Sequence, residues 1–391
     1  MTFKNHRGRV AIALLALAGL AGPTFAQDIK VGLVAPFSGP FAEYGKQMHA
    51  GIKAYQKQHG DSVAGRKIVF VVRDTTGPVP ELAKRFSQEL VTREKVDFLA
   101  GYGFTPEALA AAPVAEQAKI PMVVMNAAGT TAVAKSAYSV RFSNTLPQVA
   151  APMGRWAKQN GIGNVVTLVA DFTPGIEAET SFKESFSKAG GQVVESMRVP
   201  LDSKDLTPYI QRIKDRKPQA VFMWLPAGDM TISIIKRFRE RGLAEAGIKL
   251  IATGDLTDDH LLPAMGEEAV GLVTTYHYSM AHDSPENIAF KKAFKEANLE
   301  SGRPNFMTIA AYDGTAAIYE VVRRLNGKIE GDKAMGVLKN IKLTSPRGPI
   351  QIDPATRDVV QTVYVRRVER VNGQLENVEF SKFNNINAKG E

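Results

Sequence analysis

Residues 29–45 read IKVGLVAPFSGPFAEYG, and this stretch decides the fold class. Its first part is a short run of apolar and β-branched residues that stops at Pro36, which is typical of a buried strand. A turn rich in proline and glycine follows, and residues 47–58 then carry apolar side chains at helical spacing. A strand, a turn and a helix in this order predict one unit of an α/β fold.

The same unit recurs until about residue 141. Its predicted strands cover residues 29–34, 68–72, 96–100 and 122–125. Its predicted helices cover residues 47–58, 81–93 and 107–118. Because right-handed crossovers join successive strands of this kind, they predict one parallel sheet with helices on both faces.

A second series follows Phe142. Its predicted strands cover residues 165–169, 192–197, 220–224, 250–252 and 270–274. Its predicted helices cover residues 149–158, 176–189, 206–216 and 230–241. The order then changes to consecutive helices at 285–298, 308–325 and 333–339, followed by paired strands at 348–352 and 359–369. Two sheets in series predict two lobes, each a mostly parallel sheet flanked by helices.

The composition fits a globular protein of this size. The chain has 391 residues, of which 44% are hydrophobic and 23% are charged, enough for two cores of ordinary domain size. It contains no cysteine, which excludes disulfides, thiolate metal sites, cysteine nucleophiles and a lipid anchor on cysteine. The net charge is +9, but lysine and arginine are scattered among acidic residues, so we expect no nucleic-acid partner.

Residues 1–26 have the pattern of a secretory signal peptide. A basic start precedes an apolar run from Val10 to Leu20, and Pro23, Thr24 and Ala26 precede a cleavage site before Gln27. The run is too short to span a bilayer comfortably, although a retained N-terminal anchor is the alternative. We therefore predict export through a cleaved signal peptide and a periplasmic location.

Ligands of parallel α/β sheets bind beyond the carboxyl ends of the strands, so the loops that follow strands are candidate sites. Three such loops of the first lobe, 36–45, 101–106 and 126–131, are rich in small and hydroxyl-bearing residues. Hydroxyls and free N–H groups suit a carboxylate. Thr105 is the expected helix cap, with Pro106 at the first helical position. Ordinary turn chemistry explains any one loop, but three together favour a site. Their aromatic residues suit an apolar ligand body: Tyr44, Tyr102 and Phe104.

The second lobe offers matching loops at 171–174, 224–228 and 254–256. Trp224 ends a predicted strand and adjoins a Pro-Ala-Gly turn, so we interpret it as a wall of the pocket, although a core position is the alternative. His277 lies in the segment expected to cross between the lobes, and we predict a hydrogen-bonding or solvated role for it.

No enzymatic motif is present. The chain lacks G-x-S-x-G, H-E-x-x-H, a P-loop and a complete dinucleotide fingerprint, since Pro106 stands where the last needs its third glycine. An acid/base pair of Asp171 and Asp255 in a hydrolase or lyase is the enzyme alternative, but capping and polar recognition explain both residues more simply. We therefore predict no catalytic residue, no cofactor and no metal.

Several of these segments, taken in order, resemble the leucine/isoleucine/valine-binding type of periplasmic solute-binding protein. They are Val31–Pro40 with Tyr44 and Gly45, the turns at 101–105 and 126–130, and Gly348–Asp353. The resemblance implies a type I periplasmic-binding-protein fold, a Venus flytrap of two α/β lobes joined by three crossings. It also implies a monomer that delivers its ligand to an ABC permease in the inner membrane. The first lobe would take residues 27–146 and 278–346, and the second 147–277 and 347–391.

The resemblance also implies a site. Thr105 and Thr130 would bind the carboxylate of an amino acid with backbone from Tyr102 and Gly129, and Asp255 would bind the ammonium group. The complete set of predicted ligand-binding residues is Tyr44, Tyr102, Gly103, Phe104, Thr105, Asn126, Ala128, Gly129, Thr130, Phe172, Trp224 and Asp255.

Two departures from the family pattern bear on the ligand. Pro147 stands at a second acidic position and Pro174 at a lid tyrosine, while Phe104, Phe172 and Trp224 add aromatic surface. The family favours a branched-chain or related amino acid, and the pocket residues favour an aromatic carboxylate without an amine. A ligand sensor that reports to a receptor is the alternative to transport.

Overall fold

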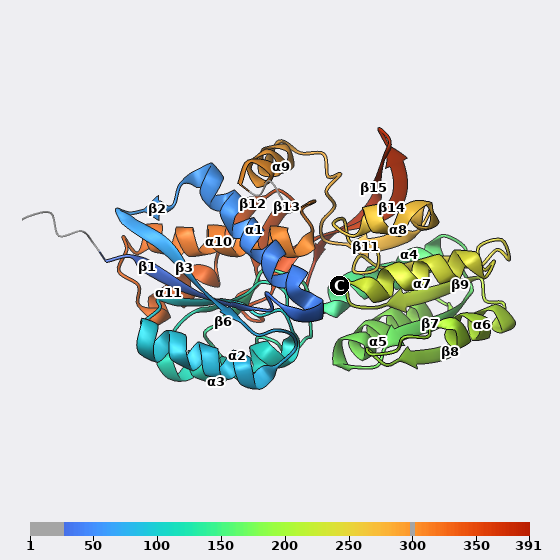
Figure 1. Cartoon of the computed structure of the whole chain (residues 1–391), viewed down its shortest axis with the longest axis horizontal. Coiled ribbons are helices and arrows are strands. Elements are labelled where there is room, and N and C mark those ends of the chain that lie inside the picture. The colour runs from blue at the N-terminus through green and yellow to red at the C-terminus, as the bar shows by residue number, and fades with distance from the viewer. Residues whose placement is uncertain (1–26, 298–301) are drawn as a thin grey trace, which may run out of the picture.

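The structure is a computed structural model, which describes residues 27–297 and 302–391. The predicted signal peptide lies outside the described residues. Two α/β lobes lie side by side, each with its own sheet and flanking helices (Figure 1). In the described part of the chain, no helix is long and apolar enough to cross a membrane.

The sheet of the first lobe has six strands in the order β2-β3-β1-β4-β5-β6. All neighbours are parallel except β2 and β3. The strands are β1 Ile29–Ala35, β2 Ser62–Val63, β3 Arg66–Asp74, β4 Phe98–Gly101, β5 Met122–Val124 and β6 Ser139–Arg141. Strand β1 is almost wholly buried, as its continuous apolar run predicts.

Helices cover both faces of this sheet (Figure 1). One group packs together as α1 Ala42–His59, α9 Pro285–Ala297 and α10 Phe306–Arg324, with α11 Gly331–Leu338 against α10. The other group is α2 Pro80–Glu89, continued by a π-turn over Leu90–Glu94, and α3 Thr105–Ala118. Helices from two distant parts of the sequence therefore complete one lobe.

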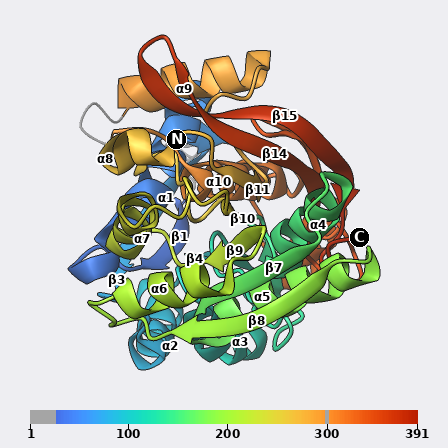
Figure 2. The same ribbon diagram turned by 90° about the vertical axis from the view of Figure 1, so that its right-hand side faces the viewer.

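The second sheet has nine strands, most of them in the second lobe, while Ile350 and Ile352 of its strand at 348–352 pack in the core of the first lobe. Its parallel part is formed by β7 Asn164–Ala170, β8 Gln192–Val199, β9 Ala220–Trp224, β10 Lys249–Thr253 and β11 Val273–Tyr276. Its antiparallel part is formed by β12 Lys342–Ser345, β13 Gly348–Ile352, β14 Val359–Val371 and β15 Gln374–Ile386. In Figure 2 the long β14–β15 hairpin, coloured red, arches along one side of the lobe.

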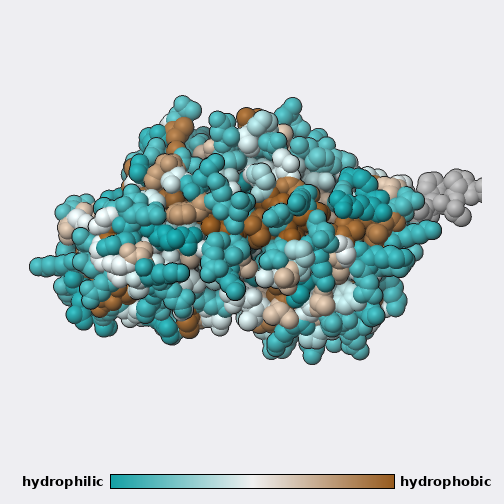
Figure 3. All heavy atoms as spheres, turned by 180° about the vertical axis from the view of Figure 1, so that it is seen from behind, coloured by the Kyte–Doolittle hydropathy of each residue, from teal (hydrophilic) through white to brown (hydrophobic). Residues whose placement is uncertain are grey.

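Helices of the second lobe are α4 Leu146–Gln159, α5 Thr173–Lys188, α6 Thr207–Arg216, α7 Asp229–Glu240 and the short α8 Leu262–Met265. Short 3-10 turns cover Gly39–Phe41 and Gly266–Ala269. The rear face of the molecule is mostly hydrophilic, and apolar residues gather on it in limited areas (Figure 3).

Most predicted elements agree with the observed ones to within a few residues, but β2, β6, β12, β15 and the short helix α8 were not predicted from the sequence. Strand β15 has many exposed polar residues, so it lacks the apolar run that marks a buried strand. Strand β12 pairs with β13, so the predicted lobe boundary after residue 346 falls inside a hairpin. Strand β11 begins at Val273 rather than at 270, because the chain turns before it.

Candidate functional site

A cavity lies where the carboxyl ends of the two sheets face each other. It is lined by loops that follow β1, β4 and β5 of the first lobe and β7, β9 and β10 of the second. Its volume, the open mouth included, is about 430 Å³. The lining residues are Tyr44, Gly103, Phe104, Thr105, Asn126, Ala128, Asn144, Phe172, Pro174, Trp224, Pro226, Asp255, Tyr276 and Phe306.

One wall of the cavity is a cluster of stacked rings from the first lobe. Tyr44 and Phe104 are nearly parallel, with ring centroids 5.3 Å apart and an interplanar angle of 17°. Phe41 packs edge-on against both rings, at 5.5 and 5.0 Å. The Tyr44 hydroxyl donates a hydrogen bond across the cleft to the Ala227 carbonyl at 3.4 Å, so this wall also contacts the second lobe.

The opposite wall comes from the second lobe. Phe172 and Trp224 pack with their ring centroids 5.5 Å apart. Trp224 ends the buried strand β9, as predicted, and is only 4% exposed. Its buried indole N–H has no hydrogen-bond partner among the described residues, although it lies near the carboxylate of Asp255. A buried N–H donor in this state favours a ligand that accepts a hydrogen bond.

The first lobe supplies the donors. Helix α3 begins at Thr105, and Phe104 rather than Thr105 occupies the cap position, which corrects the predicted cap. The Thr105 hydroxyl instead accepts a hydrogen bond from the Gly129 N–H at 2.9 Å, so its own proton can be donated. The positive end of the α3 dipole lies at the same place. Together these groups suit an anionic ligand group.

The second lobe supplies one acidic group, Asp255. Its carboxylate accepts hydrogen bonds from the Thr253 hydroxyl at 2.8 Å and from the Tyr276 hydroxyl at 3.1 Å. Burial raises the pKa of Asp255, while these two hydrogen bonds oppose the rise. Of the described residues that line the cavity, Asp255 is the only charged one. The cavity therefore offers the Thr105 hydroxyl as a donor on the first-lobe side and Asp255 as an acceptor on the second-lobe side.

Most of the predicted site residues line this cavity. They are Tyr44, Gly103, Phe104, Thr105, Asn126, Ala128, Phe172, Trp224 and Asp255. Their convergence follows from the topology, because the strand ends that carry them meet at facing edges of the two sheets.

Tyr102, Gly129 and Thr130 were also predicted, but they lie outside the cavity lining. Tyr102 has a left-handed backbone (φ 65°), and its buried hydroxyl bonds the Ser87 hydroxyl at 2.8 Å in the core beside α2. The Gly129 N–H donates to the Thr105 hydroxyl, which does line the cavity. The Thr130 N–H and hydroxyl both donate to the carboxylate of Glu177 on α5, each at 2.9 Å.

Pro174 and Pro226 lie in the candidate loops 171–174 and 224–228 but were not named as ligand-binding residues, whereas Asn144, Tyr276 and Phe306 lie outside all the candidate loops. Asn144 and Tyr276 lie beside points where the chain crosses between lobes, and Phe306 comes from α10. No local pattern marks these positions, since only the assembled lobes bring them to the cleft.

His277 has neither of its predicted roles. The side chain is fully buried, and no described residue hydrogen-bonds either ring nitrogen. It packs against Tyr276 and Phe306, both of which line the cavity. Burial, together with the charges of Arg347 and Arg366, holds its pKa well below the ordinary value. A neutral ring that supports two lining residues is thus a packing element.

Two α/β lobes that enclose one cavity, with rings, donors and an acid contributed from both sides, define a protein that captures a small solute between its lobes. Residues 28–374 match the periplasmic binding protein family, and the chain belongs to it. It is a solute-binding protein of the ABC-transporter type. The predicted family and fold class are confirmed.

The similar proteins differ in the ligands that they are named for or were solved with. The chain is 43% identical over 380 residues to Leu/Ile/Val-binding protein homolog 6 of Brucella melitensis biotype 1, covering 96% of this chain and 97% of that one. It is also similar to a solute-binding protein of an ABC transporter from Rhodopseudomonas palustris BisB5, solved with 3,4-dihydroxybenzoic acid. That structure has 46% identity and a TM-score of 0.89, covering 93% and 99% of the two chains.

A second solved structure, a solute-binding protein of an ABC transporter from R. palustris, is in complex with 4-hydroxybenzoate. It is 43% identical with a TM-score of 0.90, and the match covers 93% of this chain and 98% of that one.

Proposed function

We propose that this protein captures an aromatic carboxylate that carries a ring hydroxyl, of the 4-hydroxybenzoate class, and presents it to an ABC permease. The observation that carries the proposal is the pair of aromatic walls that face each other across the cavity. A flat ligand ring would pack against the rings of both walls, where each aromatic pair contributes about 0.5 to 1.5 kcal/mol beyond its buried area.

The polar groups support one orientation of this ligand. The carboxylate would lie against the α3 N-terminus and the Thr105 hydroxyl, where donors and a positive dipole meet. The ring hydroxyl would donate to Asp255, which has accepted only two hydrogen bonds and has room for more. A neutral hydroxyl supplies this donor without adding a second charge to the cavity.

A branched-chain amino acid is the competing ligand, and Asp255 is its natural partner because a carboxylate pairs well with an ammonium group. Four aromatic rings in the walls are more than an aliphatic side chain needs, however. The sequence identity of this chain to the relatives in complex with hydroxybenzoates is similar to its identity to the Brucella relatives named for leucine, isoleucine and valine. We therefore favour the aromatic acid.

The remaining parts of the proposal concern location and mechanism. The leader sequence and the family support export to the periplasm and delivery to a permease. Binding would close the lobes, because the ligand contacts both and so favours the closed population. The protein would act as a binding protein and not as an enzyme.

Titration calorimetry with 4-hydroxybenzoate, benzoate and leucine tests the ligand class. We expect 4-hydroxybenzoate to bind most tightly and leucine to bind weakly or not at all. Asp255→Asn should weaken 4-hydroxybenzoate about 10- to 150-fold, the range for a hydrogen bond to a charged group, and should leave benzoate nearly unchanged. Asp171→Asn, an exposed acid outside the cavity, is the matched control. Tight leucine binding that Asp255→Asn abolishes would show that the ligand is an amino acid.

A further inference from the structure

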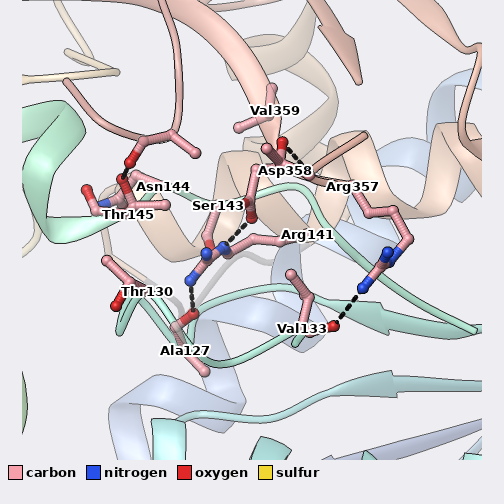
Figure 4. Close-up of polar contacts among 12 residues, drawn as sticks. Ala127, Thr130, Val133, Arg141, Ser143, Asn144, Thr145, Arg357, Asp358 and Val359 are labelled. Carbon is pink, nitrogen blue, oxygen red and sulfur yellow. Dashed lines mark hydrogen bonds and ion pairs between the residues drawn. The ribbon is translucent and has the colours of Figure 1, made fainter. Parts of the chain in front are cut away.

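Arg141, the last residue of β6, makes an unusual set of contacts close to the cavity without lining it (Figure 4). Its side chain is fully buried. The Nε atom donates to the Asp358 carboxylate at 2.7 Å. One terminal nitrogen donates to two carbonyl oxygens, Ala127 at 2.9 Å and Gly129 at 2.7 Å. One guanidinium thus joins two segments that are more than 200 residues apart.

One of the two segments that the Arg141 guanidinium contacts is residues 126–130, here called the ligand-binding loop. Asn126 and Ala128 of this loop line the cavity. The Gly129 N–H donates to the Thr105 hydroxyl and so fixes the direction of that hydroxyl. The fit is close, since a Cβ atom on Gly129 would lie 2.7 Å from the Thr105 Oγ1. The positions of the Gly129 carbonyl and N–H therefore determine how Thr105 faces a ligand.

The other segment that Arg141 holds is a chain crossing. Asp358 immediately precedes β14, the strand that leads into the second sheet, and Arg141 also donates its backbone N–H to the Arg357 carbonyl at 3.0 Å. A further crossing meets the loop here, because the Leu146 N–H at the start of α4 donates to the Ala128 carbonyl at 3.0 Å. The ligand-binding loop is thus anchored where the two lobes are joined.

The ion pair is an inefficient way to add stability. Both charges are buried, and the second terminal nitrogen of Arg141 has no partner among the described residues. Desolvation offsets much of the attraction in such a pair. A guanidinium does offer several donors in one rigid plane, which a lysine cannot do. The contacts of Arg141 are better explained by the positions they impose on the loop.

We propose that Arg141 is a positioning residue for ligand capture, which ties the ligand-binding loop to the Asp358 crossing and thereby orients the Thr105 hydroxyl. The inference rests on the proposed site, but part of its test needs no ligand.

The ligand-free test is hydrogen–deuterium exchange over residues 126–130 of the whole protein. Arg141→Lys should raise exchange there at least about tenfold, because the loop carbonyls lose their shared donor. Arg357→Lys is the matched control: Arg357 also donates to two backbone carbonyls in this region, Ser139 at 3.1 Å and Val133 at 2.8 Å, but to none in the loop (Figure 4). Equal exchange in the two variants would overturn the proposal. If Arg141→Lys does not fold, Asp358→Asn, which keeps an acceptor oxygen, should give a smaller rise in the same peptide.

The second test is titration of 4-hydroxybenzoate. Arg141→Lys should raise the dissociation constant about tenfold or more, and Arg357→Lys should change it less than twofold. Thr105→Val should cost less in the Arg141→Lys background than in the parent, since the hydroxyl is no longer oriented there. Additive losses would assign Arg141 a merely structural role. A parent that fails to bind 4-hydroxybenzoate would count against the proposed ligand only, because the exchange test stands without it.

Discussion

Removal of the Glu177 carboxylate should weaken ligand binding although Glu177 does not line the cavity. Thr130 belongs to the first lobe and Glu177 to α5 of the second, and two hydrogen bonds join them at 2.9 Å each. These contacts exist only while the lobes are close together. They therefore stabilise the closed form specifically, and Glu177→Ala should shift the equilibrium toward the open form.

The magnitude follows from the geometry and the exposure of the pair. Hydrogen bonds to a charged group contribute about 1.5 to 3 kcal/mol when buried. Thr130 is exposed and Glu177 half-buried, so solvent reduces the sum for both bonds to about 1 to 2 kcal/mol. This corresponds to a loss of about 5- to 30-fold in affinity. The whole factor reaches the measured dissociation constant when the open form predominates without ligand.

The assay combines titration calorimetry with stopped-flow dissociation. We expect Glu177→Ala to act mainly on the dissociation rate, because the lost contacts hold the closed complex together. Glu184→Ala, on the same helix, and Thr131→Val, an exposed neighbour of Thr130, are matched controls, because among the described residues neither side chain makes a hydrogen bond or ion pair across the lobes. A double-mutant cycle of Thr130→Val and Glu177→Ala should show coupling.

Unchanged affinity and dissociation rate in folded Glu177→Ala would refute this reasoning. So would an equal effect of Glu184→Ala, because a general change in the charge of α5 would then explain the loss. Small-angle scattering tests whether the loss comes from lobe closure, since Glu177→Ala should then need more ligand than the parent to reach the compact form.

Three other outcomes are expected. Thr105→Val should raise the dissociation constant about 10- to 150-fold in titration calorimetry, since its hydroxyl is aimed by Gly129, and an unchanged value would remove Thr105 from the site. Trp224→Ala should weaken an aromatic ligand more than Trp224→Phe does, because phenylalanine keeps a ring in the wall; equal losses would assign the effect to the indole N–H. Burial raises the pKa of Glu107 from 4.5 to about 7, so the folded state binds its proton more tightly than the unfolded state and stability falls as pH rises from about 4.5 through 7. Glu107→Gln should remove that fall, so the variant should gain up to about 3 kcal/mol of stability over the parent at pH 8 compared with their difference at pH 5. Chemical unfolding of both proteins at the two pH values measures this, and a variant whose stability falls with pH as steeply as the parent's would contradict the prediction.

Local pattern was sufficient for the elements that form the sheets and for many lining residues. The apolar run of β1 and the turn after it could be recognised because a buried parallel strand needs continuous apolar residues, whereas a helix needs apolar residues every three or four positions. Phe104, Thr105 and Asp255 could be located because ligands bind at the carboxyl ends of such strands. These properties depend on neighbours along the chain.

Contacts between distant segments could not be read in this way. Thr130 has a hydroxyl and lies in a candidate loop, as a ligand-binding residue would, but its N–H and hydroxyl both donate to Glu177 of the other lobe. The ring of Tyr102 was expected to pack on the ligand, but it lies in the core, where its hydroxyl bonds the Ser87 hydroxyl. Phe306 reaches the cavity from α10, and Arg141 meets Asp358 across the crossing.

The sequence by itself thus determined the α/β units, their order and the loops from which a site is built, because hydrophobic period and turn chemistry are local. Only the tertiary structure decided which donors face the ligand and which are taken by another lobe. The physical reason is that a donor group bonds whichever acceptor lies within about 3 Å of it in the folded chain, and two such groups can be far apart along the sequence.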